Sequence, residues 1–173
     1  KMKKLLIKTC NLPDEYTINT PNLQTLGLKE TYVKKLQYGK MDKLKYLSLG
    51  LNVIQNGKEK ASPVTVLDLQ KSKNIAELSV TGCRINKLDL SSVNKTLRLA
   101  SITQSGKYPI KQVRLGKMAA LKGLSVSAKC AAIDASKCSR LNTLECASYG
   151  IFKVKLPKSV QYLTLTSLDK KGC

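Results

Sequence analysis

Apolar residues recur along most of the chain in one short pattern, L-x-x-L-x-L-x-x-N/C-x-L, in which L stands for any aliphatic residue. Three copies fill every position: Met2, Leu5, Ile7, Cys10 and Leu12; Leu44, Leu47, Leu49, Asn52 and Ile54; and Ile75, Leu78, Val80, Cys83 and Ile85. A fourth copy begins at Leu23 and has Thr31 in the Asn/Cys position. Looser copies begin at Asn94, Leu121, Leu141 and Val160, so successive first positions are 21, 21, 31, 19, 27, 20 and 19 residues apart.

A second apolar pair follows about half a repeat later, with one residue between its two members. These pairs are Tyr16/Ile18, Leu36/Tyr38, Leu67/Leu69, Leu88/Leu90, Val113/Leu115, Ile133/Ala135 and Val154/Leu156. A period of two is typical of an extended segment with one buried face. Each repeat therefore has room for two extended segments and little helix, which predicts a stack of thin, mostly β layers.

These repeats resemble the leucine-rich repeat family over nearly the whole chain. Within that family, Leu88-Asp89-Leu90-Ser91-Ser92 and Leu67-Asp68-Leu69-Gln70-Lys71 are similar to the short repeats of internalin-like and gut-bacterial surface proteins. The resemblance implies a leucine-rich repeat solenoid of the α/β-horseshoe class, mostly β, with about eight short rungs and parallel strands on its inner face. It also implies a bacterial secreted or cell-surface module for adhesion or protein binding. We expect residues 1–173 to form one domain, as a fragment of a larger protein.

The composition fits thin layers better than a compact core. Apolar residues make up 42% of the chain, but it has one Phe and no Trp, so Leu, Ile and Val must fill the interior. No run of about 18 apolar residues is present, so we expect no membrane span.

Catalytic and metal-binding motifs are absent from the sequence. Without a histidine, Ser-His and Cys-His nucleophiles cannot be assembled within this chain. No phosphate-binding glycine loop and no paired CxxC motif occurs, so we expect no enzyme, no cofactor and no metal. Asp68, Asp89 and Asp134 are expected to form a solvated row relieved by Arg114. Most of the six cysteines are expected to be small buried hydrophobes; whether Cys130 and Cys173 are free or paired stays open.

The inner face is the first candidate for a binding surface. It is formed by the residue between the two core positions of each first strand and the residue two places before it. Its candidate anchors are Tyr46, Arg98, Tyr162, Glu77 and Glu145, because Tyr and Arg are enriched at binding hot spots. We expect a protein or glycan partner here; the alternative is a plain sheet surface with incidental tyrosines.

The charge supplies a second candidate. The chain carries 31 Lys and Arg against 11 Asp and Glu, a net charge of +20. Lysines recur four residues after the first apolar residue of the second strand: Lys40, Lys71, Lys117, Lys137 and Lys158, with Ser92 interrupting the series. Such an edge could match an anionic polymer, although no aromatic platform accompanies it and we expect no specific nucleic acid. A structural spacer without a ligand is the third alternative.

Overall fold

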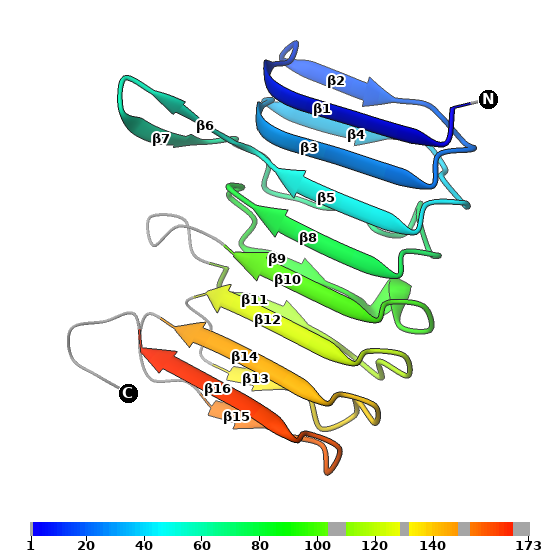
Figure 1. The fold of residues 1–173 in the computed structure, drawn as a ribbon, viewed down its shortest axis with the longest axis vertical. Coiled ribbons are helices and arrows are strands. Elements are labelled where there is room, and N and C mark those ends of the chain that lie inside the picture. The colour runs from blue at the N-terminus through cyan, green and yellow to red at the C-terminus, as the bar shows by residue number, and fades with distance from the viewer. Residues whose placement is uncertain (1, 104–109, 129–131, 149–152, 168–173) are drawn as a thin grey trace.

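The computed structural model describes residues 2–103, 110–128, 132–148 and 153–167. The chain winds into a mostly β, parallel solenoid of about seven turns with almost no helix. Eight parallel strands form one continuous sheet, here called the front sheet, in the order β1-β3-β5-β8-β10-β12-β14-β16 (Figure 1). Shorter strands lie behind it and form the back face (Figure 1).

Each pass of the chain along the front adds one strand to this sheet. Its strands are β1 (Lys4–Asn11), β3 (Thr25–Tyr32), β5 (Tyr46–Gly50), β8 (Glu77–Thr81), β10 (Leu99–Thr103), β12 (Gly123–Ala128), β14 (Thr143–Ser148) and β16 (Tyr162–Ser167). Apolar residues stack in register on the side of the front sheet that faces the core. For example, Leu47 pairs with Leu78, and Leu49 pairs with Val80. All four are buried, so the alternation of the sequence places a continuous aliphatic core behind the front sheet.

Among the described residues, the back face carries three short parallel ladders. β2 (Glu15–Ile18) pairs with β4 (Lys35–Tyr38), β9 (Lys87–Asp89) with β11 (Gln112–Arg114), and β13 (Ala132–Asp134) with β15 (Lys153–Lys155). In the described part of the chain the helical content is one 3-10 turn, η1 (Ser91–Val93). The expectation of a mostly β solenoid is confirmed.

The expected alignment of the fifth repeat is wrong by three residues. Leu97 and Leu99 were expected to be its two inward strand residues, with Asn94 as its first position. Instead Ala100 pairs with Leu78 and Leu124, and Ile102 pairs with Val80 and Val126. Leu97 is buried and occupies the first position of the repeat, whereas Leu99 is 49% exposed on the solvent-exposed side of the front sheet. The small Ala100 fills a position that the pattern assigns to a large aliphatic residue, which is why the neighbouring leucines imitate the motif.

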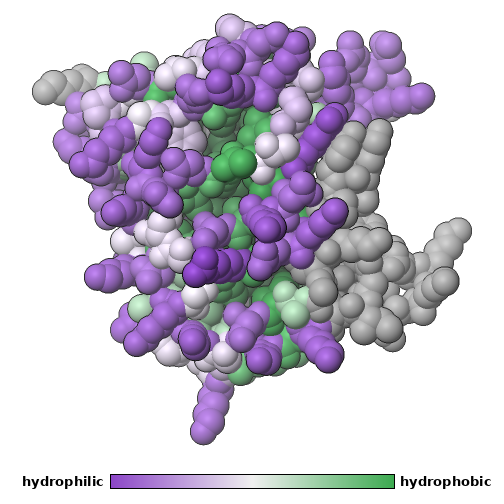
Figure 2. Space-filling view, turned by 180° about the vertical axis from the view of Figure 1, so that it is seen from behind, coloured by the Kyte–Doolittle hydropathy of each residue, from purple (hydrophilic) through white to green (hydrophobic). Residues whose placement is uncertain are grey.

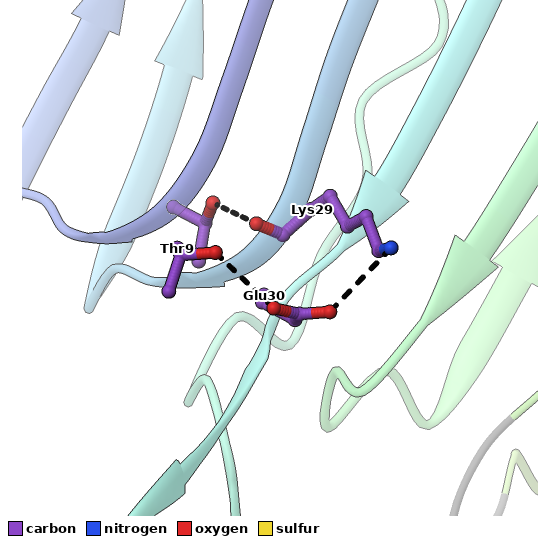
Figure 3. A network of polar contacts seen from close by, with 4 residues as sticks. Thr9, Lys29 and Glu30 are labelled. Atoms are coloured by element: carbon purple, nitrogen blue, oxygen red, sulfur yellow. Dashed lines mark hydrogen bonds and ion pairs between the residues drawn. The ribbon is translucent and has the colours of Figure 1, made fainter.

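The Asn/Cys position directs its side chain inward, after a residue that has positive φ in several turns. Thr31 is fully buried and donates from Oγ1 to the Lys29 carbonyl at 3.0 Å, and the Cys83 thiol makes the same contact with the Thr81 carbonyl at 3.5 Å. The residue just before this position has positive φ in three turns: Thr9 (52°), Glu30 (50°) and Gly82 (68°). Figure 3 shows how Thr9 and Lys29 hold Glu30, through a 3.1 Å hydrogen bond and a 3.6 Å ion pair.

Two segments, residues 56–63 and 104–109, interrupt the regular spacing of the repeats as insertions. The first contributes to a hairpin that projects beyond the stack (Figure 1). β6 (Asn52–Gln55) and β7 (Lys58–Ala61) are antiparallel, and Asn56 and Gly57 both have positive φ, as a tight two-residue turn requires. The Lys60 ammonium lies 4.3 Å from the ring centre of Tyr32, which ties the hairpin to β3. The second insertion, at 104–109, lies outside the described residues.

Candidate functional site

A groove of about 700 Å³ runs across the solvent-exposed side of the front sheet, the side that carries the predicted inner-face residues. Its floor follows the central residue of successive strands, which is small in five neighbouring turns: Gly27, Ser48, Ser79, Ser101 and Ser125. Small side chains here leave backbone and Cβ atoms as the surface. A volume of this size lies within the usual range for sites that bind small molecules or short segments of a partner.

Exposed apolar side chains lie along this floor. Leu6 is 48%, Tyr46 is 46% and Leu99 is 49% exposed, and all three line the groove. Leu6 lies over Gly27, because a Cβ added to that glycine would come within 2.6 Å of Leu6 Cδ2. Leu99 covers Gly123 in the same way at 2.9 Å. The glycines therefore allow apolar side chains to lie flat on the sheet.

The groove differs in charge from the rest of the molecule. Its charged lining residues are Glu77, Glu145 and Lys122, although the whole chain carries +20. An apolar lining with one net negative charge offers no basic patch to a polyanion, so it suits neutral or cationic partners better.

The structure brings together some of the predicted inner-face residues. Tyr46, Glu77 and Glu145 line the groove. Tyr162 is 65% exposed and occupies the same column on β16, but it is not part of the groove lining. The placement of Arg98 is wrong, because with the alignment corrected it precedes β10, and its backbone N–H donates to the Ala76 carbonyl at 2.7 Å.

Leu99 and Ser101 occupy the two inner-face positions that were assigned to Thr96 and Arg98. One sequence signal could have located them. If the fifth repeat starts at Leu97, its first position lies 22 residues after Ile75 and 24 residues before Leu121. These spacings are more even than the 19 and 27 residues that a start at Asn94 gives.

The five lysines of the predicted edge lie at corresponding positions of their repeats. Lys40, Lys71, Lys117, Lys137 and Lys158 are all exposed, and each immediately precedes an inward-facing or partly buried turn residue. Lys40 forms an ion pair with Asp42 at 3.0 Å. A shallow basic surface adjoins Lys40 and Lys71 and includes Lys73.

The back-face carboxylates serve the turns. Asp68, Asp89 and Asp134 each accept, through Oδ1, the backbone N–H two residues later at 2.9–3.0 Å, the geometry of an Asx turn. The expected neutralisation by Arg114 is confirmed for Asp89, at 3.5 Å, whereas Asp134 pairs with Lys155 at 3.8 Å.

Two of these carboxyl groups have shifted pKa values. Partial burial opposes ionisation of Asp89, but hydrogen bonds from Ser91 and the charge of Arg114 outweigh it, so its pKa lies below the ordinary value. The Ser136 hydroxyl and backbone N–H, with Lys155 and Lys137 nearby, hold the pKa of Asp134 below its ordinary value against a small opposing effect of burial. These groups are anionic turn-formers near neutral pH.

Three of the four described cysteines are buried, as expected: Cys83, Cys138 and Cys146. Cys10 is exposed, which corrects the expectation for that residue; it lies in β1, an edge strand of the front sheet. Burial raises the pKa of Cys83 to about 12. Cys130 and Cys173 lie outside the described residues.

Within the described ranges no cluster of three or more potential metal ligands occurs. In that same part of the chain, no helix is both long and apolar enough to cross a membrane.

Comparisons of this chain with models of protein families, with curated proteins and with solved structures found no match.

Proposed function

We propose that this chain is a leucine-rich repeat interaction module of a bacterial secreted or surface protein, without catalytic activity, that binds a protein or glycan partner in the front groove. The repeat identity is supported by the match between L-x-x-L-x-L and the stacked strands, one rung for each of the eight front strands. The bacterial and extracellular assignments rest on the resemblance of residues 67–71 and 88–92 to the short repeats of bacterial surface proteins.

The groove itself is the observation that carries the proposal. Leu6, Tyr46 and Leu99 are each nearly half exposed around a floor of glycine and serine. Burying exposed apolar area stabilises a complex by about 25 cal/mol per Å² before the costs of association. Tyr46 also pairs in register with Glu77 in the adjacent strand, so a hydroxyl and a carboxylate both belong to the groove lining and suit a partner that presents hydrogen-bond donors.

The test is binding to a panel of glycans and candidate surface proteins, at low and high salt, by wild type and variants. Tyr46→Ala and Leu99→Ala should each weaken a bound partner at least about fivefold, the effect of losing ~1 kcal/mol. Ile54→Ala is the matched control, because Ile54 is 70% exposed but lies on the projecting hairpin. Binding that survives both groove variants would exclude this site.

Polyanion binding by the lysine edge is the second candidate, supported by five exposed lysines at corresponding positions of the repeats. It predicts affinity for heparin or teichoic acid that falls steeply with salt, because counterions are released on binding. The double variant Lys117→Gln/Lys137→Gln should reduce the slope of log affinity against log salt by about 2. An unchanged slope would remove the edge from consideration, and failure of both tests would favour a spacer.

A further inference from the structure

A second groove, of about 620 Å³, lies on the back face between β4 and residues 63–68. Figure 2 shows this side of the molecule, where hydrophilic side chains flank a strip of hydrophobic surface that runs along the stack. The lining of this back groove includes Leu36, Tyr38, Val64, Val66 and Leu67. Val66 is 73% exposed, so the apolar wall is open to solvent.

The groove interrupts the back ladders at a place where the sequence favours a strand. Ser62 to Ser72 spans the same number of residues as Thr31 to Met41 in the preceding turn and Cys83 to Val93 in the following one. Residues 64–67 read Val-Thr-Val-Leu, which have high β propensity. Nevertheless, in the described part of the chain, β4 pairs with β2 and β9 pairs with β11, and neither pairs with residues 63–69.

The two walls are joined at their ends and separate between them. The Val33 N–H donates to Ser62 Oγ at 3.1 Å at one end, and the Met41 N–H donates to the Lys71 carbonyl at 3.0 Å at the other. Between these points the Tyr38 hydroxyl donates to the Asp68 carbonyl. No backbone hydrogen bond joins residues 34–40 to 63–70 within this described stretch.

The main chain of β4 offers an edge to this groove. The N–H groups of Lys35 and Gly39 donate toward β2, to the carbonyls of Asp14 and Ile18. Because successive residues of a parallel strand direct their backbone groups to opposite sides, those of Leu36 and Tyr38 face residues 63–68. An open edge next to an apolar wall is the arrangement used for adding a peptide strand.

The charge around the groove selects the partner. Lys34 and Lys35 already contact Asp14 and Glu15 at 2.7 and 3.1 Å. Lys71 lines the groove and makes no ion pair with another described residue. The groove also contains Asp68, whose carboxylate accepts the Gln70 N–H. With three lysines against this one carboxylate the lining stays positive, so a carboxylate on an incoming segment would complement Lys71 and a basic segment would be repelled.

We propose that this back groove binds an extended, acidic peptide segment of about five residues, which pairs with the main chain of Leu36 and Tyr38 and places a carboxylate beside Lys71. Five extended residues span about 17 Å. This is shorter than the opening along residues 34–40, whose seven extended residues would span roughly 23 Å. The site is separate from the front groove, so either can fail without the other.

The probe is a capped synthetic peptide of alternating glutamate and valine, Glu-Val-Glu-Val-Glu, added to the isotopically labelled chain of residues 1–173. Hydrogen exchange of the Leu36 and Tyr38 amides should slow at least about tenfold at saturation. The Lys35 amide, which already donates to Asp14 at 2.8 Å, should change little. A peptide N-methylated at its central residue has one donor fewer and should bind about tenfold more weakly.

Two charge reversals separate this site from general attraction to a basic protein. Lys71→Glu should weaken the peptide about tenfold, whereas Lys111→Glu, at an exposed lysine that lines neither groove, should leave the affinity unchanged. Equal effects of the two variants, equal binding of the N-methylated peptide, or protection on the front strands instead of Leu36 and Tyr38 would each overturn the proposal.

Discussion

Asn52 packs against Gly82 so closely that a Cβ added to the glycine would lie 2.5 Å from the Asn52 Cβ. The contact joins the base of the hairpin to the turn that follows β8. Gly82 also has φ +68°, a conformation that side chains with a Cβ rarely adopt.

Replacing Gly82 with alanine should therefore lower the free energy of unfolding by about 2–4 kcal/mol, through backbone strain and overlap with Asn52. Chemical denaturation followed by circular dichroism measures this. Gly116→Ala is the matched control, because Gly116 has φ +67° but a Cβ there would lie 3.7 Å from Ser91. It should lose only about 1–2 kcal/mol; equal losses would mean that the Asn52 contact is unimportant.

The corrected alignment of the fifth turn makes a second prediction. Ile102 is fully buried and Leu99 is 49% exposed, so Ile102→Ala should cost about 2–5 kcal/mol and Leu99→Ala less than about 1 kcal/mol. Thermal or urea unfolding of the two variants tests it. A larger loss for Leu99→Ala would restore the alignment expected from the sequence.

Acid should destabilise the protein through its turn carboxylates. The pKa values of Asp89 and Asp134 are lowered in the folded state, so both favour folding above the unfolded value of 3.8. That contribution is lost as pH falls through the lower, folded values. The double variant Asp89→Asn/Asp134→Asn retains an oxygen for each turn but cannot titrate. Its urea midpoint should fall less than that of wild type between about pH 4 and pH 2.

Thiol labelling should distinguish the described cysteines. In the native protein Cys10 should react with a maleimide at least about a hundredfold faster than Cys83, because it is exposed while burial raises the pKa of Cys83 to about 12. Peptide mapping by mass spectrometry assigns each product and also follows Cys138 and Cys146, which should label only after unfolding. Rapid native labelling of Cys83 would contradict its buried position.

Most of the front sheet follows from the spacing of its aliphatic residues, because each inward position is repeated in the neighbouring strand. Tyr46, Glu77 and Glu145 were placed correctly for the same reason. The fifth turn was not, since Ala100 carries too little hydrophobicity to mark a core position between Leu97 and Ile102. The glycine and serine floor was visible in the sequence as a column, but that Leu6 and Leu99 lie flat over Gly27 and Gly123 depends on contacts between strands.

The back groove could not be predicted from the pattern. Leu67, Asp68 and Leu69 match Leu88, Asp89 and Leu90 in spacing and residue type, yet only the second set belongs to a ladder. The difference arises from packing between turns, which local periodicity does not encode. Pro63, which has no N–H to donate, stands at the start of the unpaired segment.

The breaks between the back ladders give the stack a mechanical asymmetry. The front strands are hydrogen-bonded without interruption from β1 to β16, whereas the described back strands pair only as β2-β4, β9-β11 and β13-β15, with no strand pairing from one ladder to the next. Bending should therefore concentrate at the gaps between these ladders, with the front sheet as the hinge line and the back edges moving apart. A load applied along the stack would be shared between these gaps.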